Sequence, residues 1–400
     1  MKKPEQAEFD LTVLALNGLR RGRTTGTCAT AAVKAALIML LTGEQRSQVK
    51  VTLPDRAFYM AVPIQRVAWL DGETVRAEVL KDGGDDPDNT HGATIFAEVR
   101  RNDCGEVRFF AGRGVGTATQ PGLRVAVGEP AINPTPRLMM RQTVAEVLDD
   151  VRRAGYARHE APTQFMAGIA RPTNGQGFDL TIGCENGEVI ARKTFNPRLG
   201  IVGGISILGT SGIVEPMSLA TWIASIEVYV RVALGGGAQS VAYLPGKIGR
   251  EFARDVLKLP EQRTVQIANF LGDALDFTEA ALHGEGRTLD VLWLAGHPGK
   301  LAKVLDDVWD THSSKSSMAM AGVARVAAER GFAPHLVNEI KNANTVEAAM
   351  ERIKNEAGAQ ALWMDIERRI GAAAQVRLPS VSRVEVRLFD LAGNLLGEGA

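Results

Sequence analysis

The sequence predicts an α+β N-terminal domain followed by an α/β, Rossmann-like C-terminal domain with a mainly parallel sheet. Three observations support this fold class. The chain has 400 residues, enough for two domains with ample cores. Its first half has many short β-like segments around few helical ones, whereas its second half alternates strand-like and helix-like segments. The pattern changes near residue 195, so we expect domains at 1–195 and 196–400.

The N-terminal half is predicted to contain two helices and a set of strands. Apolar residues recur at helical spacing from Cys28 to Leu41. A second amphipathic helix is expected to start with Thr135 as N-cap and Pro136 at its first helical position, and to end at about Arg153. The strand-like segments are 49–53, 59–67, 74–80, 93–100, 106–110, 123–127, 178–182 and 187–191.

The C-terminal half shows the alternation that a parallel sheet requires. A strand at 201–208 is expected to lead into a helix that starts around Pro216 and ends at Leu234. Strand–helix pairs follow at 240–244 and 247–258, at 264–270 and 272–283, and at 289–294 and 298–309. Helices at about 315–330, 345–356 and 358–373 and a β-hairpin at 383–398 complete the prediction.

Composition narrows the classes of function. Lysine plus arginine and aspartate plus glutamate both number 46, so no net charge attracts nucleic acid or an anionic membrane. Aromatic residues make up only 6%, which argues against base-stacking surfaces. The N-terminus lacks the apolar stretch of a signal peptide, and the longest apolar run, 35–41, is too short to span a bilayer. Cys28, Cys104 and Cys184 fit neither a disulfide framework nor a zinc site, so we expect a cytoplasmic protein.

The stretch 81–92, Lys-Asp-Gly-Gly-Asp-Asp-Pro-Asp-Asn-Thr-His-Gly, holds four carboxylates and a histidine between two β-like segments. So much like charge needs compensation by a metal, a ligand, backbone N–H groups or nearby arginines. A calcium loop is excluded, because His91 stands where glycine is required and Ala97 where the bidentate glutamate is required. The alternative to a functional site is a solvated loop whose carboxylates cap turns and helix ends.

Two glycine-rich segments in the C-terminal half are candidates for anion binding. Gly209-Thr210-Ser211-Gly212 lies between a predicted strand and a predicted helix, where free N–H groups suit a carboxylate or phosphate. Gly296-His297-Pro298-Gly299-Lys300 has a similar position but is not a Walker A loop, because Leu301 replaces serine or threonine. The segment 110–116 also has nucleotide-loop spacing, but no helix can follow it directly, which favours a simple turn between strands.

Two further segments each allow two interpretations. Asp310 and His312 could do acid–base chemistry, or they could be a helix cap and a satisfied histidine. Residues 20–28, Arg-Arg-Gly-Arg-Thr-Thr-Gly-Thr-Cys, place basic and hydroxyl groups at a helix N-terminus, which describes either an anion site or a simple N-cap with exposed arginines. Cys28 has no histidine or aspartate beside it in sequence, so a nucleophilic role is not expected.

Together these segments resemble the CbiD family, the cobalt-precorrin-5B C1-methyltransferases of cobalamin biosynthesis. The resemblance runs in order from about residue 20 to 313 and is highly specific as a group. It departs from the family pattern at Gly83, where alanine is usual, and after His312, where a serine-rich segment replaces an acidic, arginine-bearing one. The matching residues are Gly22, 24–29, 81–88, 90–92, 128–134, 136–137, 196–200, 203–212, 296–297, 299–301 and 311–313.

The resemblance implies the transfer of a methyl group from S-adenosylmethionine to ring carbon C1 of a ring-contracted tetrapyrrole. It implies no metal bound by the protein itself, because any cobalt belongs to the substrate. The implied fold, an α+β domain followed by a Rossmann-like domain, agrees with the pattern above. Partners consistent with the resemblance are neighbouring enzymes of the cobalamin pathway and further copies of the chain.

The resemblance also suggests roles for the candidate residues. A corrinoid precursor carries many carboxylates, so its site needs basic side chains and N–H groups. Positioning should supply most of the acceleration, with one base to take or hold a proton. We expect that base to be Asp85, Asp86, Asp88 or His91, with His312 as runner-up. Substrate contacts are expected from Arg23, Thr24, Thr25, Gly26, Thr27, Lys81, Arg137, Asn196 and Arg198. Contacts with the methyl donor are expected from Gly209, Thr210, Ser211, Gly212, Gly296, His297, Gly299 and Lys300.

Two other functions remain open at this stage. A non-catalytic carrier of corrinoid intermediates would share the substrate site but would not bind S-adenosylhomocysteine. A nicotinamide-dependent reductase of the same macrocycle is disfavoured, because the segment 110–116 lacks the helix that a dinucleotide fingerprint needs.

Overall fold

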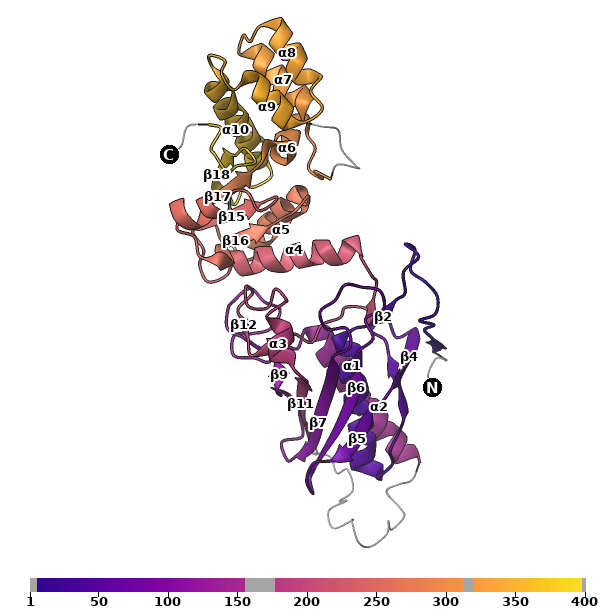
Figure 1. Cartoon of the computed structure of the whole chain (residues 1–400). Coiled ribbons are helices and arrows are strands. Elements are labelled where there is room, and N and C mark those ends of the chain that lie inside the picture. Colours follow the sequence, from indigo (N-terminus) through magenta and orange to yellow (C-terminus); the bar gives the residue numbers. More distant parts are fainter. Residues whose placement is uncertain (1–5, 155–176, 313–318, 398–400) are drawn as a thin grey trace. The chain divides into compact units, whose positions relative to one another are not determined.

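The computed structural model describes residues 6–154, 177–312 and 319–397, and the chain divides into two compact units (Figure 1). The first unit comprises Met1–Gln120 and Arg124–Ser218, and the second comprises Pro121–Leu123 and Leu219–Ala400. The division therefore falls after Ser218 and not near residue 195. The cause is strand pairing: β14 (Ile213–Val214) runs antiparallel to β2 (Gly22–Arg23), which holds the segment before Ser218 in the first unit.

The first unit is built on a five-stranded sheet of order β5-β6-β7-β11-β8. Its neighbouring strands are antiparallel except for β8, which runs parallel to β11. Helix α1 packs on β6 and β7 and against α2. The main elements are α1 (Thr25–Thr42), β5 (Arg66–Trp69), β6 (Thr74–Leu80), β7 (Thr94–Asn102), β8 (Val107–Ala111), α2 (Pro134–Arg153) and β11 (Gly177–Cys184). The smaller ones are β1 (Ala7–Glu8), β3 (Gln48–Thr52), β4 (Phe58–Pro63), β9 (Gly114–Val115), β10 (Thr117–Ala118), α3 (Gly187–Ala191), β12 (Ile201–Val202) and β13 (Gly204–Ile205).

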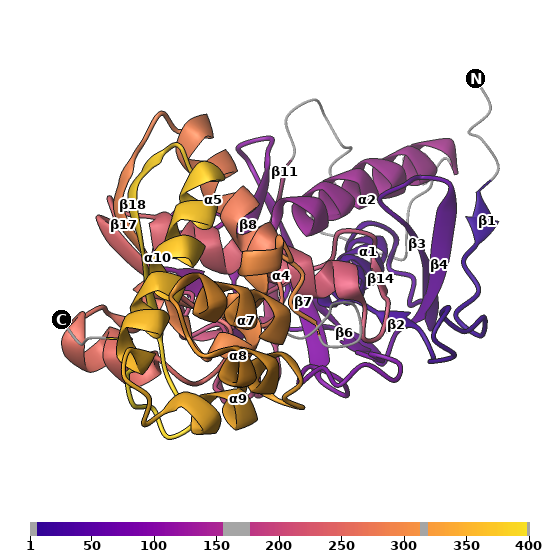
Figure 2. The same ribbon diagram turned by 90° about the horizontal axis from the view of Figure 1, so that it is seen from above.

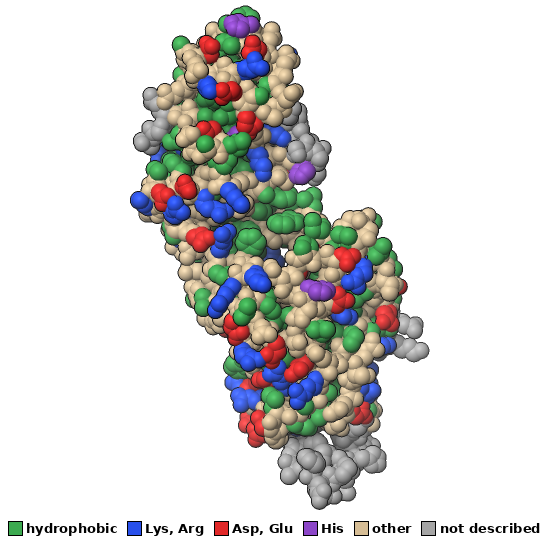
Figure 3. All heavy atoms as spheres, in the orientation of Figure 1, with side chains coloured by type: hydrophobic (Ala, Val, Ile, Leu, Met, Phe, Trp, Pro, Cys, Tyr) green, Lys and Arg blue, Asp and Glu red, His purple; other side chains and the backbone are tan. Residues whose placement is uncertain are grey.

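The five-stranded sheet has one apolar and one charged face. Alternate residues of β6 are buried, as period-2 patterning requires, and Arg76 lies among the half-buried ones. The Arg76 guanidinium forms ion pairs with Glu78, Glu98 and Glu185 and lies 3.7 Å from the centre of the Phe96 ring. Acidic and basic side chains are likewise intermingled on the face of the first unit shown in Figure 3. These paired charges explain how the unit can carry many arginines without a strongly basic surface.

Helix α1 is the central core helix of the first unit. The Thr27 N–H donates to the Oγ1 of the N-cap Thr24 at 3.1 Å, and Gly43 ends the helix in the left-handed region at φ 73°. The helix is long and apolar enough for a membrane span, longer than the run 35–41 indicated. However, 83% of it is buried inside the protein, as is usual for a core helix.

Several predicted elements of the first unit differ from those observed. Residues 187–191 form helix α3 and not a strand, because Asn186 turns the chain through the left-handed region at φ 56°. Residues 123–127 form no strand. The predicted strand 201–208 is divided into β12 and β13 by Gly203, whose φ is 94°. Helix α2 has Asn133 at its N-cap, two residues before the expected N-cap Thr135.

The second unit contains the predicted parallel sheet, with strand order β16-β15-β17-β18. The chain adds β16 on one side of β15 and β17 on the other, so the direction of winding reverses between β15 and β17. Side chains from α4, α5 and α10 join the sheet in one apolar core. The main elements are α4 (Leu219–Leu234), β15 (Ser240–Leu244), β16 (Thr264–Gln266), α5 (Leu271–Gly284), β17 (Leu289–Gly296), α10 (Ala359–Val376) and β18 (Val381–Leu388).

The remaining helices of the second unit are short. Helices α7, α8 and α9 pack in sequence against one another (Figure 2). The predicted helix 247–258 contains a π-helical turn, and the predicted helix 298–309 is split into α6 and a 3₁₀ segment. Residues 313–318 at the start of the predicted helix 315–330 lie outside the described residues. The bounds are η1 (Phe252–Val256), η2 (Glu261–Arg263), α6 (Pro298–Leu301), η3 (Ala302–Asp306), α7 (Met320–Glu329), α8 (Pro334–Lys341) and α9 (Val346–Ile353).

The hairpin predicted at 383–398 is present in reduced form around residues 392–394, where the Leu396 N–H donates to the Leu388 carbonyl, and its first strand joins the parallel sheet. Strand β18 pairs along its length with β17, from Leu289 opposite Val381 to Gly296 opposite Leu388. The second strand of the predicted hairpin contributes a single bridge, between Phe389 and Leu395. Full pairing with a buried parallel strand satisfies more backbone groups than a terminal hairpin would, which explains the outcome.

Candidate active site

The acidic loop between β6 and β7 neutralises much of its charge internally. Lys81 Nζ, on a side chain that is 1% exposed, lies 2.6 Å from Asp88 Oδ2. Asp88 also accepts the backbone N–H and the hydroxyl of Thr90 at 2.8 and 2.7 Å. Burial opposes ionisation of Asp88, but Lys81 and these hydrogen bonds outweigh it and lower the carboxyl pKa. Lys81 and Asp88 therefore hold the loop together through their own ion pair.

Asp85 and Asp86 are adjacent but differ in their contacts. Both oxygens of Asp85 accept from Arg20, one from the backbone N–H and one from Nε. Asp86 Oδ1 accepts the Met217 N–H at 3.0 Å, whereas its Oδ2 receives no hydrogen bond from any described residue. Asp86 is thus better placed than Asp85 and Asp88 to accept a proton from a bound molecule.

His91 is held in one tautomer by the loop backbone. Its Nδ1 accepts the Gly83 N–H at 3.1 Å, so the ring proton of the neutral imidazole sits on Nε2. The side chain is 50% exposed, and Nδ1 lies 3.9 Å from Asp82 Oδ1. In this tautomer His91 offers a hydrogen-bond donor to a ligand, which suits a carboxylate or carbonyl and does not suit the expected role of base.

Glycines bring the acidic loop into backbone contact with residues 20–23. A Cβ on Gly22 would overlap the backbone of Gly83, and a Cβ on Gly84 would overlap the backbone of Arg20. Arg23 N–H donates to the Asp82 carbonyl at 2.7 Å across the same contact. Two segments that the sequence analysis treated separately therefore form one structural unit.

The N-terminus of α1 and the segment 206–212 also pack on each other. The Gly26 N–H donates to the Leu208 carbonyl at 2.8 Å, and the Thr27 hydroxyl donates to the Gly212 carbonyl at 2.6 Å. A Cβ on Gly209 would overlap the Thr24 side chain. The segment Gly209–Gly212 lies in the first unit, is followed by β14 and not by a helix, and uses its glycines for close packing. Its expected position at a strand–helix junction of the parallel sheet is therefore wrong.

Several other predicted site residues have mainly structural contacts. The Arg137 guanidinium donates to the Ile132 and Pro130 carbonyls and to Glu129. The Asn196 amide donates to the Gly204 carbonyl, and its oxygen accepts the Ser206 hydroxyl. The side chains of Thr24, Thr25 and Thr27 are buried, and Arg198 lies 6.0 Å from the centre of the Phe195 ring.

Arg23 differs from these residues. Its Nε is buried, and within the described part of the chain it has no hydrogen-bond partner. Its guanidinium forms no ion pair with those residues either. A buried, unpaired guanidinium nitrogen is costly unless an acceptor completes it, so Arg23 is the strongest candidate for an anion contact among the predicted site residues of this unit.

In the second unit, the loop 296–300 lies where β17 ends, at the carboxyl edge of the sheet. His297 is the N-cap of α6, and its Nδ1 accepts the Gly299 N–H at 3.0 Å. Its Nε2 lies 2.9 Å from Glu347 Oε1. Burial lowers the pKa of His297, although the charges of Glu347 and Asp390 oppose this change. Glu347, on α9, was not expected at this loop, and no sequence motif connects the two.

Two lysines fix the carboxyl edge of the sheet. Lys300 Nζ donates to the carbonyls of Pro245 and Ala268, at 3.0 and 3.3 Å, which follow β15 and β16. Lys303 Nζ donates to the Thr311 carbonyl at 3.2 Å. Burial lowers the pKa of both ammonium groups. Lys300 therefore ties three strand ends together, and Lys303 is a contributor that the sequence analysis missed.

His312 lies at the end of a described segment. Its backbone N–H donates to Asp310 Oδ1 at 3.2 Å, and the Thr311 N–H donates to the Asn269 carbonyl at 3.0 Å. The serine-rich residues 313–318 that follow it lie outside the described residues. His312 thus belongs to the second unit, with the loop 296–300, whereas Asp86 and His91 belong to the first. Across the residues that the structure describes, no three histidine, cysteine or acidic side chains gather in a metal-binding group.

Ordered loops of glycine, hydroxyl and charged residues, one of them at the carboxyl edge of a parallel sheet, define a protein of the small-molecule-binding α/β class. The chain belongs to the CbiD family: residues 14–216 match CbiD, and residues 310–400 match the CbiD C-terminal domain.

Relatives of known name are similar along the whole chain. A protein of Chromobacterium violaceum named cobalt-precorrin-5B C(1)-methyltransferase is 58% identical over 99% of this chain and 100% of its own length. One of the same name from Ralstonia nicotianae is 59% identical over 99% of this chain and 98% of its own. A crystal structure of cobalamin biosynthesis protein (cbiD) from Archaeoglobus fulgidus is 26% identical, covers 80% of this chain and 88% of that one, and has a TM-score of 0.37.

Proposed function

We propose that this protein is a cobalt-precorrin-5B C(1)-methyltransferase that uses S-adenosylmethionine as methyl donor in cobalamin biosynthesis. The observation that carries the proposal is the similarity, at 58 and 59% identity over 99% of the chain, to two proteins of that name. The three cysteines are free thiols, which suits a reducing cytoplasm. The natural acceptor is then a tetrapyrrole with several acetate and propionate carboxylates.

We assign acceptor binding to the first unit. The buried, unpaired Arg23 Nε supports a contact with a substrate carboxylate, and the exposed His91 supports a second through its Nε2–H. Lys81, Arg137 and Asn196 act indirectly, because their polar atoms hold the surrounding loops. The Arg23 N–H donates to the Asp82 carbonyl and the Gly83 N–H donates to His91, so the loop 82–84 positions both residues.

We assign the proton acceptor to Asp86. The methyl donor supplies an electrophilic methyl group on a sulfonium, and the ring carbon supplies the electron pair of the new bond. Asp86 Oδ1 is fixed by the Met217 N–H, which leaves Oδ2 to accept a proton from the macrocycle or to hold it. Asp85 and Asp88 have every carboxylate oxygen bonded by local donors, which argues against them.

We assign donor binding to the second unit. Its parallel strand order, with the winding reversed between β15 and β17, supports a Rossmann-like architecture, in which ligands bind at the carboxyl ends of the strands beside the reversal. The loop 296–300 follows β17 at this edge, and Lys300 connects it to the ends of β15 and β16. We therefore keep Gly296, His297, Gly299 and Lys300 in the donor site and omit residues 209–212.

Incubation of the purified chain with cobalt-precorrin-5B and S-adenosylmethionine tests the proposal. We expect a product heavier by one methyl group and an equal amount of S-adenosylhomocysteine, both measured by mass spectrometry. Binding of the tetrapyrrole without product or S-adenosylhomocysteine would indicate a carrier and refute the enzyme.

The base is tested with two neighbouring aspartates. Asp86→Asn is expected to lower kcat by about 100-fold, the usual contribution of a general base. Asp85→Asn is the matched control, because it breaks an exposed contact with Arg20 and should leave kcat within about twofold. Equal turnover of the two variants would remove Asp86 from the mechanism.

A further inference from the structure

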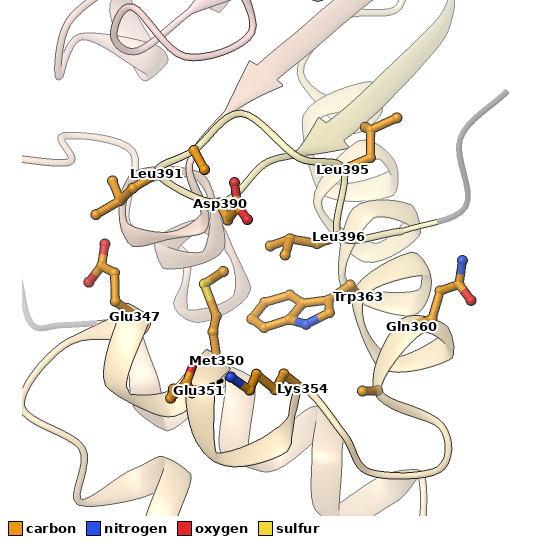
Figure 4. Close-up of a pocket in the computed structure, with 12 residues that line it drawn as sticks. Glu347, Met350, Glu351, Lys354, Gln360, Trp363, Asp390, Leu391, Leu395 and Leu396 are labelled. Carbon is orange, nitrogen blue, oxygen red and sulfur yellow. Dashed lines mark hydrogen bonds and ion pairs between the residues drawn. The ribbon is translucent and has the colours of Figure 1, made fainter.

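The second unit contains an open pocket that no predicted site residue lines. It has a volume of about 490 Å³ and lies between α9, the start of α10 and the turn that follows β18 (Figure 4). A pocket of this size matches a ligand of nucleoside dimensions. The lining residues are Glu347, Met350, Glu351, Lys354, Ala359, Gln360, Trp363, Asp390, Leu391, Ala392, Leu395 and Leu396.

Trp363 brings to the pocket an indole N–H that has no acceptor among the described residues. Its indole ring extends from α10 into the middle of the pocket, with Leu396 and Met350 beside it (Figure 4). The residue is only 4% exposed, yet its indole N–H donates to no acceptor in the part of the chain that the structure describes. Because the indole nitrogen is not fully buried, its N–H remains open to solvent and can donate to an acceptor on a ligand in the pocket.

The charges around the pocket restrict the ligand further. Three acidic residues, Glu347, Glu351 and Asp390, face one lysine, Lys354, which is already paired with Glu351. Hydrogen bonds from Asn394 to both oxygens of Asp390 keep that carboxyl ionised and its pKa low, although burial opposes this. Excess negative charge repels phosphate groups and favours hydroxyl donors and cations.

The pocket is connected to the carboxyl edge of the sheet. Glu347 lines the pocket and also lies 2.9 Å from His297 Nε2 in the loop after β17. Asp390 follows β18, the next strand of the same sheet, and its charge acts on His297. The pocket is therefore an extension of the edge to which we assign the methyl donor.

We propose that this pocket binds the adenosyl group of the sulfonium methyl donor and of its thioether product. One adenine ring nitrogen accepts the Trp363 indole N–H, and the acidic side chains face the ribose hydroxyls and the sulfonium charge. A phosphate-bearing nucleotide is excluded by the same carboxylates. The inference rests on the proposed function and names the part of the second unit that recognises the donor.

Calorimetric titration of the full chain with S-adenosylhomocysteine tests the pocket without reference to turnover. Trp363→Phe keeps the ring and removes the donor, so affinity should fall about tenfold. Trp309→Phe is the matched control, because the Trp309 N–H donates to Asp307 outside the pocket, and it should bind as wild type does. Leu391→Arg provides a second variant that leaves the core intact, because Leu391 is 64% exposed; the longer side chain should block the pocket and abolish binding.

Two competitors test the chemistry of recognition. Adenosine should displace S-adenosylhomocysteine, whereas adenosine monophosphate should compete at least tenfold more weakly, because its phosphate meets the carboxylates. If Trp363→Phe and Leu391→Arg both bind S-adenosylhomocysteine with wild-type affinity, the pocket is not the adenosyl site. The proposed function still stands in that case if the wild type methylates its acceptor. A wild-type chain that neither binds S-adenosylhomocysteine nor methylates would overturn the proposed function and the pocket together.

Discussion

Lys81 Nζ lies 2.6 Å from Asp88 Oδ2, with the lysine side chain almost fully removed from solvent. An ammonium group in this position depends on its carboxylate, because removal of one partner leaves a buried charge uncompensated. Asp88→Asn should lower the free energy of unfolding by about 2 kcal/mol, less than for a fully buried pair because Asp88 is 28% exposed. Urea denaturation measures this loss, and Lys81→Met with Asp88→Asn should recover part of it.

The same pair predicts a pH dependence. The pKa of Asp88 is lowered in the folded protein, so its contribution to stability is complete above the pKa of the unfolded chain, about 3.9. This contribution is lost as the pH falls through the folded pKa. The free energy of unfolding of the wild type should therefore fall more than that of Asp88→Asn between pH 5 and pH 3. Parallel plots of this free energy against pH would show that Asp88 is not the cause.

The glycines of the acidic loop are predicted to differ in tolerance. Gly84→Ala meets the Arg20 carbonyl and keeps an unfavourable φ of 66°, so it should cost about 3 kcal/mol or more. Gly92 has a similar φ of 75° but nothing within 4 Å of a Cβ, so Gly92→Ala should cost only about 1 kcal/mol. Gly83→Ala should cost less than about 1 kcal/mol, because the nearest atom, Lys81 Nζ at 3.2 Å, has to move only slightly and the backbone is not in the left-handed region. Thermal melting of the three variants distinguishes close packing from backbone strain.

The cysteines should react in a fixed order. Burial raises the pKa of Cys28 to about 11 and that of Cys184 to about 12, whereas Cys104 is exposed. Iodoacetamide at pH 7.5 should therefore label Cys104 alone in the folded protein and all three residues in urea. Peptide mapping gives the order, and Cys28→Ala should retain full turnover. Rapid labelling of Cys28 in the native state would instead reopen its nucleophilic role.

Glu367 is expected to make stability fall as the pH rises. Burial raises its pKa to about 7, although the Leu388 N–H donates to it at 2.7 Å. Between pH 4.5 and pH 7 the folded state then binds more protons than the unfolded state, so stability decreases over this range. Glu367→Gln, which can still accept the Leu388 N–H, should be more stable than wild type by about 1–3 kcal/mol at pH 8 and equal to it at pH 4.5. Equal unfolding curves of the two proteins at pH 8 would show that burial of the ionised Glu367 carboxylate does not destabilise the fold.

Much of the architecture could be predicted from the sequence, because period and length are local signals. Helices α1 and α2 and the strands β15, β16 and β17 lie close to their predicted positions, and the parallel sheet of the second unit is confirmed. The family was also identified correctly from the ordered motifs. The errors arise where tertiary pairing decides the outcome. Residues 383–388 alternate as a hairpin strand would, but only the fold shows that β17 is their partner.

Site prediction was less complete for a related reason. Motif composition showed that residues 24–27, 81–92 and 209–212 belong to special loops, but it could not show that their glycines and hydroxyls bond mainly to one another. Trp363 and Glu347 carry no motif, and both lie in ordinary helices, so nothing in the sequence distinguishes them. They line a pocket only together with the turn after β18, and the sequence does not show that this turn lies beside them.

The pairing of β14 with β2 has a consequence for how the protein is made. Strand β2 leaves the ribosome among the first thirty residues, yet its partner is synthesised about 190 residues later. Until then the N-terminus of α1 lacks the carbonyls of Leu208 and Gly212 that complete it. The first unit therefore cannot complete these contacts until residue 214 has been synthesised, and we expect chains that end earlier to expose the apolar helix and to aggregate.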